Sequence, residues 1–259
     1  MKTKLTYTLL FLLIGLGKSF AQNAHFVYNG IIEFEKRSNM HAIIKRKINK
    51  QNETFYLPVF ESYKKNNPQF KVSKSTLVFT SDKSLYKYAP GDDALNGNWV
   101  ARDVLTDLKN TVATNFASES SITQKSVYEE LYLLKDSVRK INWKITDETR
   151  NIAGFECRRA NALIMDSIYV VAYYTNEIAV SGGPESFTGL PGMILGLALP
   201  HENITWFATK VTEVAIPEKD LAPPAKGKPV DKKALQTMLK AAMKDWGSDA
   251  NAEIKGFLL

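Results

Sequence analysis

Residues that could carry metal or redox chemistry are few and scattered along this sequence. The three histidines, His25, His41 and His201, lie far apart, and no HExxH, clustered Cys/His or EF-hand pattern is present. We therefore predict no metal site and no cofactor. A metal site that the fold assembles from His201, Glu202 and a distant carboxylate stays open as an alternative.

Patterns for nucleophilic, acid–base or nucleotide chemistry are missing as well. Glu129 and Glu130 are adjacent on an expected strand, so their carboxylates point to opposite faces and share no acid–base task. Ser181 lacks both a Gly-x-Ser-x-Gly sequence and the strand-to-helix context of a nucleophile elbow. The glycines of residues 182–196 form neither a dinucleotide fingerprint nor a P-loop. We predict no catalytic residues, and a hydrolase without a recognisable motif remains an alternative.

Charge and cysteine content restrict the class of protein further. The chain has 34 basic and 27 acidic residues, a net charge of +7, and three of the lysines precede residue 22. The basic run Lys45–Lys47 and the pair Arg158–Arg159 are too small, and too poor in interleaved aromatic residues, for a nucleic-acid surface. Cys157 is the only cysteine, and its strand spacing from Phe155 predicts a buried thiol.

The most unusual stretch is the loop of residues 182–195. Leu190–Met193 has the residues of a type II turn, in which Gly192 would take a positive φ. One interpretation is a structural corner; the other is a surface for a ligand or partner. The residues that we expect to form the sharp turns are Gly183, Pro184, Gly189 and Gly192. The residues that we expect to contact a ligand or partner are Tyr174, Phe187, Leu190, Pro191, Gly192 and Met193.

The elements that must position this loop are mainly strands. Val104, Leu105, Leu108, Val112 and Phe116 recur at helical spacing and predict an amphipathic helix at 101–116, after a loop at 90–98. Short apolar runs joined by polar turns predict strands or hairpins in these ranges: 28–36, 41–48, 76–88, 127–145, 152–165, 168–174 and 204–211.

These elements predict a mainly β (α+β) fold: a curved antiparallel sheet or half-barrel, with one or two packing helices and a C-terminal helix. The strand at 168–174 is apolar at nearly every position, which indicates that both of its faces are covered. Residues 216–230 hold four prolines and read as an extended arm. Residues 231–247 then form an amphipathic helix, with Asp231 as its N-cap. We interpret this helix as part of the core, and a partner-docking helix is the alternative.

The start of the chain has the three parts of a signal peptide. Lys2 and Lys4 precede an apolar core at 8–15, and Ser19-Phe20-Ala21 presents small residues at the cleavage site. The apolar stretch is shorter than the roughly 20 residues that span a bilayer. We predict a signal peptide at 1–21, cleavage after Ala21, and a β domain at 22–215. The protein is then periplasmic or secreted, and not an integral membrane protein.

At the loop, the sequence resembles the GLPGLI family of exported proteins from Gram-negative envelopes. The naming motif stands here as Gly189-Leu190-Pro191-Gly192-Met193-Ile194, with Met193 in place of the usual leucine. The segments that also match the family are these: 143–146, 152–160, 173–178 and 183–187. The resemblance covers roughly 127–214. The family has no established activity, so the resemblance implies none.

These observations leave several functions open. We expect a periplasmic binding, carrier or accessory protein of the cell envelope, with an apolar ligand such as a lipid or lipoprotein, by analogy with exported half-barrels. The alternative is a soluble subunit that docks on an outer-membrane transporter or assembly complex. No nucleic-acid partner is expected.

Overall fold

The computed structural model describes residues 25–89 and 99–259. The predicted signal peptide, its cleavage site after Ala21 and the predicted loop at 90–98 therefore lie outside the described residues. None of the helices in the described part combines the length and the apolar character that a bilayer-spanning helix needs.

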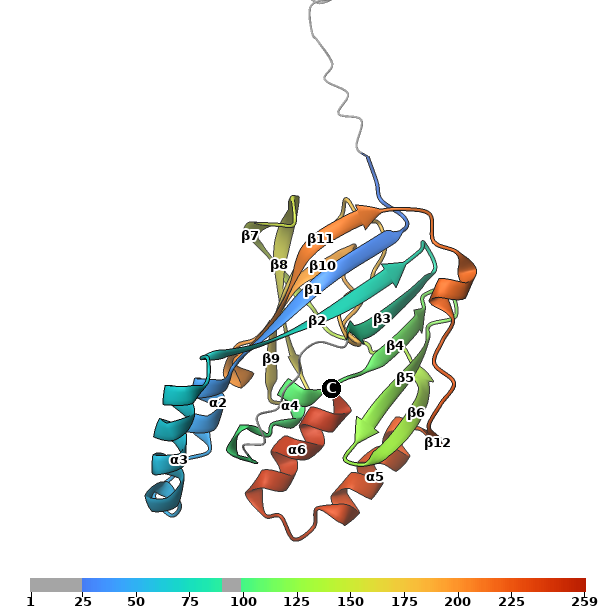
Figure 1. The fold of residues 1–259 in the computed structure, drawn as a ribbon. Helices are drawn as coiled ribbons and strands as arrows, with labels where there is room; N and C mark the ends of the chain where they lie inside the picture. Colours follow the sequence, from blue (N-terminus) through green and yellow to red (C-terminus); the bar gives the residue numbers. More distant parts are fainter. Residues whose placement is uncertain (1–24, 90–98) are drawn as a thin grey trace, which may run out of the picture.

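Within these ranges, twelve strands form one open, curved sheet (Figure 1). Their order across the sheet is β12-β6-β5-β4-β3-β2-β1-β11-β10-β9-β8-β7. All neighbours pair antiparallel except β12 and β6, which pair parallel. The predicted mainly β fold with a curved sheet is thus confirmed, with one parallel pair added. The bounds are β1 Gly30–Asn39, β2 Phe70–Phe79, β3 Lys83–Ala89, β4 Thr111–Asn115, β5 Ser120–Val127, β6 Glu130–Ser137, β7 Lys144–Ile152, β8 Phe155–Ile164, β9 Ile168–Thr175, β10 Met193–Leu199, β11 Ile204–Glu213 and β12 Lys228–Val230.

The helices gather at one end of the sheet. In Figure 1, α2 and α3 project as a pair beyond the ends of β1 and β2, whereas α4, α5 and α6 lie near the ends of β4 to β6. The bounds are α2 Met40–Arg46, α3 Glu53–Asn66, α4 Val104–Asp107, α5 Lys232–Ala242 and α6 Ser248–Leu258, with short 3-10 turns η1 Trp99–Ala101, η2 Pro200–Glu202 and η3 Glu218–Leu221.

The alternating side chains of β1 explain how the sheet builds its core. Ile32 and Phe34 are buried, whereas Glu33 faces solvent. The same period places Lys36 on the inner face, where only 3% of it is exposed. In β9 and β10, buried residues occupy both faces, as the apolar run at 168–174 predicted.

A second, smaller core attaches the last helices to β5 and β6. Leu235, Leu239 and Met243 pack with Ile254 and Phe257 against the strands. Burying a large apolar side chain stabilises the fold by about 1.5–3 kcal/mol, so α5 and α6 belong to the folded domain. Trp246, by contrast, is exposed.

The strand predicted at 41–48 is wrong: these residues form α2. Met40, Ile43 and Ile44 recur at i, i+3 and i+4 and bury one helix face. The side chain of Asn39 accepts a hydrogen bond from the Ala42 N–H at 3.2 Å and caps the helix. Over so short a stretch the apolar pattern fits both a strand and a helix, and the Asn39 cap favours the helix.

Two further element predictions are wrong. The helix expected at 101–116 is reduced to α4, since β4 begins at Thr111 and pairs with β3. The hairpin expected at 127–145 does not form, because β6 pairs with the preceding strand β5 and β7 pairs with β8. The polar strand β5 carries little apolar pattern, so its pairing had no signal in the sequence.

The proline-rich residues 216–230 run along the sheet. Leu221, in η3, is buried. β12 then adds to the edge of the sheet, where Lys228, Pro229 and Val230 lie opposite Tyr132, Leu133 and Leu134. The helix that follows starts after the Asp231 cap, whose side chain accepts a hydrogen bond from the Ala234 N–H at 2.7 Å. α6 was not anticipated.

Candidate functional site

The residues expected to contact a ligand lie in the core. Tyr174, Phe187, Leu190 and Met193 are each at most 2% exposed, and Gly192 is buried too, whereas Pro191 is exposed. The structure brings these side chains together through packing around β9 and β10. A ligand would reach them only after the core had moved, so a contact role for them remains a prediction.

The turns of this loop differ in detail from the expected geometry. Gly192 has φ +150° and Gly189 has φ +93°, which confirms the positive φ predicted for Gly192. The Gly192 N–H donates to the Leu190 carbonyl at 2.8 Å, so a three-residue turn closes around Pro191 in place of the type II turn. The Met193 N–H donates instead to the Ile178 carbonyl at 3.2 Å. Met193 is therefore tied to the neighbouring chain segment and does not close the turn.

A second turn of the loop, at 184–187, carries a buried carboxylate, Glu185. The Phe187 N–H donates to the Pro184 carbonyl at 3.2 Å, and Glu185 has φ +54°. The Glu185 carboxylate accepts hydrogen bonds from Asn110 Nδ2 at 2.9 Å and from the Tyr86 hydroxyl at 3.4 Å. The bend that was predicted at Gly183 and Pro184 thus aims an acidic group into the interior.

Two buried lysines share this interior with Glu185. Lys36 lies on β1 and donates to the carbonyls of Leu105 and Thr106, and its ammonium is 5.1 Å from the centre of the Trp206 ring. Lys125 lies on β5, is 3% exposed and donates to the Phe257 carbonyl at 2.5 Å. Each lysine thus holds a backbone segment that covers the inner face of the sheet.

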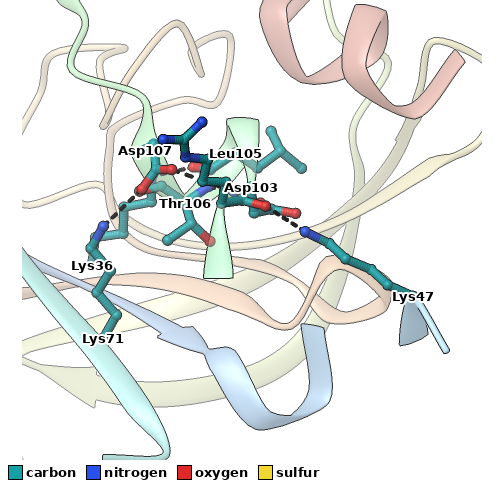
Figure 2. A network of polar contacts seen from close by, with 8 residues as sticks. Lys36, Lys47, Lys71, Asp103, Leu105, Thr106 and Asp107 are labelled. Atoms are coloured by element: carbon teal, nitrogen blue, oxygen red, sulfur yellow. Dashed lines mark hydrogen bonds and ion pairs between the residues drawn. The ribbon is translucent and has the colours of Figure 1, made fainter. Parts of the chain in front are cut away.

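Figure 2 shows how the segment 102–107 is held by lysines from three elements. Lys36 from β1 binds its carbonyls, as described. Lys71 from β2 forms an ion pair with Asp107 at 2.7 Å, and Lys47, just after α2, donates to the Arg102 carbonyl. The segment contributes Asp103 as N-cap of α4, through a hydrogen bond from the Thr106 N–H at 3.0 Å. It closes one side of the interior.

Burial shifts the ionisation of all three charged groups. Burial lowers the pKa of Lys36 to about 8, although Glu185 and the nearby aspartates oppose the shift. Burial likewise lowers the pKa of Lys125 to about 8, against the attraction of Glu185. Burial raises the pKa of Glu185, and Lys36 is the main influence that opposes it. The carboxylate therefore offsets part of the unfavourable burial of both lysines.

A polar cavity of about 290 Å³ adjoins this network, between β4–β6, the segment 137–140 and the end of α6. Lys125, Arg139, Lys140 and Lys232 line it, and Asp136 is an acidic residue in the same wall. Two of these cations are already engaged at α6: Lys125 with Phe257, and Arg139 with the Leu258 carbonyl at 2.7 Å. They cap the carbonyl end of that helix, which is a structural role.

Two buried polar atoms in the cavity wall nevertheless have no hydrogen-bond partner among the described residues. These are the side-chain oxygen of Asn110 and the hydroxyl of Thr188. Asn110 and Thr188 are at most 5% exposed. Because a buried polar group without a partner costs about 1–3 kcal/mol, such atoms indicate a bound molecule or water. Asn110 joins the cavity to the network, since its amide nitrogen donates to Glu185.

A neighbouring pocket of about 320 Å³ lies beside the loop of residues 182–195, the GLPG loop. It shares Val138, Arg139, Lys140 and Thr188 with the cavity, and its wall includes Phe116, Ile141 and Gly189. The two hollows therefore meet along the segment 138–140, with the cationic side toward α5 and the more apolar side toward the loop.

The residues considered for metal or thiol chemistry lie elsewhere. No group of three or more His, Cys, Asp or Glu side chains in the described part of the chain could hold a metal ion. His25 pairs with Glu213 at 2.6 Å, and His201 lies beside the Tyr169 ring. Cys157 is fully buried, as predicted, and burial raises its pKa to about 12, which keeps it a thiol.

Sequence reasoning missed Glu185, Lys36 and Lys125 as site residues. For Lys36 a signal existed, since the alternation of the first strand continues from Ile32 and Phe34 to position 36. For Glu185 the signal was a single charged residue in an otherwise uncharged, proline- and glycine-containing loop. For Lys125 we find no such signal, because its strand is polar apart from Ile122 and Val127.

The lysines predict a pH dependence of stability that a substitution can isolate. Below about pH 8, Lys125 is charged in both states, and the unfavourable burial is fully present. Between pH 8 and 10.5 the folded chain has released the proton but the unfolded chain has not, so stability rises with pH. From pH 7.5 to 10, the free energy of unfolding of the wild type, measured with urea, should rise by about 2 kcal/mol relative to that of Lys125→Met. Replacement of an exposed lysine, Lys233→Met, serves as the control. If the difference in stability between the wild type and Lys125→Met does not change with pH, Lys125 does not have a lowered pKa.

Taken together, fold and site define a curved-sheet protein with a filled interior, a buried Glu–Lys network and a polar cavity. Residues 163–196, which include the GLPG loop, match the family described as "Protein of unknown function (Porph_ging)". No curated protein matches the chain.

Solved structures share the fold. Two structures of PNGF-II, in the C2 and P21 space groups, superpose with a TM-score of 0.50 each, at 16% and 18% identity. They cover 79% and 82% of this chain, whereas the chain spans 31% and 33% of PNGF-II. An uncharacterized conserved protein from Thermus thermophilus is more distant, with a TM-score of 0.36, 5% identity, and coverage of 78% of this chain and 90% of that one. At these identities the likeness to PNGF-II concerns the fold alone.

Proposed function

We propose that this chain is an exported binding or carrier protein of the cell envelope, and that it holds a small anionic ligand in the cavity beside Asn110. The proposal includes membership of the GLPGLI family and cleavage after Ala21, which places the protein in the periplasm or outside the cell. The match over residues 163–196 supports the family, because it contains the loop Gly189–Ile194.

The observation that carries the binding proposal is the pair of unpartnered oxygens in a cationic wall. The Asn110 oxygen can only accept a hydrogen bond, so the ligand must offer an O–H or N–H donor. Lys140 and Lys232 at the rim favour a carboxylate or phosphate on the same ligand. Burial and the neighbouring Arg139 lower the pKa of Lys232, and a bound anion would reverse that shift.

The adjoining pocket offers a place for the apolar part of a ligand, which the sequence led us to expect. An amphiphilic ligand would place its anionic group in the cavity and an apolar portion against Phe116 and Ile141. A ligand of this kind needs no opening of the main core, unlike one that contacts Phe187 or Met193 directly.

Native mass spectrometry of the protein purified from its own envelope tests the proposal. We expect a bound small molecule that carries a carboxylate or phosphate. Lys232→Gln, at the rim, should lower its occupancy at least about fivefold, the effect of losing one charge-assisted hydrogen bond. Lys233→Gln, one residue further along α5 and outside the cavity wall, is the matched control.

Three other results would contradict the proposal of an anionic ligand in this cavity. Binding that is equal in Lys232→Gln and wild type would exclude this cavity. A neutral ligand would argue against the anionic class. A co-purifying membrane protein without a small molecule would favour the alternative, a subunit that docks on an outer-membrane complex.

A further inference from the structure

The pair of helices α2 and α3 forms a projection away from the cavity. In Figure 1 it extends beyond the end of the sheet, and the turn between the two helices forms its tip. The tip leads into the first turn of α3, at Glu53–Tyr56. Trp99, in η1, packs beside it.

The net charge of the protein is concentrated in this projection. Residues 40–67 contain six basic residues and two acidic ones. The remaining residues after position 21 contain 25 of each sign, so they are neutral overall. The surplus of positive charge after residue 21 therefore belongs to the helix pair, which makes it the part of the molecule that an anionic surface attracts.

Three of these cations are free to act outward. Lys45, Lys50 and Lys65 are exposed, and no ion pair or hydrogen bond of their side chains occurs within the described ranges. The others are engaged locally: Arg46 pairs with Glu202 at 2.7 Å, and Lys64 with Glu61 at 3.2 Å. Lys47 donates to the Arg102 carbonyl and holds the 102–107 segment, as Figure 2 shows.

Exposed aromatic rings accompany the free lysines. Phe55 is 64% exposed and stacks on Trp99, which is 44% exposed, with 5.7 Å between ring centres. Tyr56 supports Trp99 edge-on at 5.2 Å. Phenylalanine and tryptophan next to lysine are the composition of segments that rest in the headgroup region of a bilayer.

We infer that the tip of α2–α3 docks on an anionic phospholipid bilayer. Lys45 and Lys50 beside the turn attract the headgroups, Lys65 at the other end of α3 adds to the attraction, and the Phe55–Trp99 stack enters the interfacial layer. The aromatic pair lies at the projecting tip, where Lys45 and Lys50 outnumber the one exposed carboxylate, Glu53, and this suits a phospholipid surface better than a protein segment. The inference is independent of the cavity: it concerns where the protein rests, whatever it binds.

Vesicle flotation tests this inference. The chain that starts at Gln22 is mixed with one of two kinds of vesicle. One kind is phosphatidylcholine alone, and the other is phosphatidylcholine with roughly 30% phosphatidylglycerol, which makes its surface anionic. We expect binding to the anionic vesicles only. Lys45→Gln/Lys50→Gln/Lys65→Gln should lower the partition coefficient at least about tenfold, since each lysine near such a surface contributes on the order of fivefold. Phe55→Ser should lower it about fivefold.

Matched controls keep the charge change but move it to another helix. Lys233→Gln/Lys240→Gln/Lys244→Gln removes three exposed lysines in and just after α5, and should leave the partition coefficient unchanged. Trp246→Ser, an exposed aromatic near α6, is the control for Phe55→Ser. Each variant is first shown to have the circular dichroism spectrum of the wild type. The inference would be overturned if the wild type bound neutral and anionic vesicles equally. It would also be overturned if both triple variants lowered the partition coefficient by the same factor.

Discussion

Replacing Glu185 by alanine is expected to lower the free energy of unfolding by about 3–5 kcal/mol, the range observed when one partner of a buried ionic group is removed. The carboxylate offsets the burial of Lys36 and Lys125. Its loss leaves Lys125 without an opposing carboxylate and leaves Lys36 with only the smaller influence of Asp103 and Asp107. It also removes the acceptor of the Asn110 and Tyr86 hydrogen bonds. Urea unfolding at pH 7 measures the change.

A double-mutant cycle separates this charge effect from simple loss of packing. Glu185→Met alone should be strongly destabilising, whereas Glu185→Met combined with Lys36→Met should lose less than the sum of the single changes, by about 1 kcal/mol or more. The exposed Glu177→Ala, also in a turn near the loop, is the control and should change stability by at most about 0.5 kcal/mol. Additive losses in the cycle would show that Glu185 does not act through the lysines.

Replacing Gly192 by valine is expected to be at least as damaging, about 3 kcal/mol or more. A Cβ atom at this position would lie 2.1 Å from the Thr175 carbonyl oxygen, and Gly192 has φ +150°, where side chains are strained. Neither the loop nor β9 can move away without disturbing the pairing of Met193 with Thr175. Thermal and urea unfolding measure the loss, and the soluble yield shows whether the variant folds.

Gly154→Ala provides the matched comparison for Gly192. Gly154 also has positive φ, +93°, but a Cβ there would meet nothing within 4 Å. Its replacement should therefore cost about 1 kcal/mol, the backbone strain alone. If Gly192→Ala is no worse than Gly154→Ala, the close approach to Thr175 is not a constraint and the loop is more adaptable than its geometry implies.

The charged network and the cavity wall have different roles. Lys36 and Lys125 hold the backbone of Leu105 and Phe257, and Glu185 accepts hydrogen bonds from Asn110 and Tyr86, so changes there act first on stability. Asn110 and Thr188 contribute unpartnered oxygens to the cavity, so changes there act on binding. A thermal melt alongside each binding assay distinguishes these two effects.

The sequence alone determined the parts of this protein that local pattern dictates. Strands with a clear period of two, such as 28–36 and 204–211, are present as β1 and β11, and the buried Cys157 follows from the same spacing. The positive φ of Gly192 follows from the demands of a sharp turn on its backbone. Each of these depends on residues within a few positions of one another.

Tertiary structure alone decided what depends on distant residues. The apolar pattern at 41–48 suited strand and helix equally, and packing of Ile43 and Ile44 under the Asn39 cap made it α2. β5 has little apolar signal and exists because β4 and β6 provide backbone partners on both sides. Glu185, Lys36 and Lys125 are separated by many residues in the chain, and only the curvature of the sheet encloses them in one interior. There their charges influence one another because water, which would screen them, is excluded.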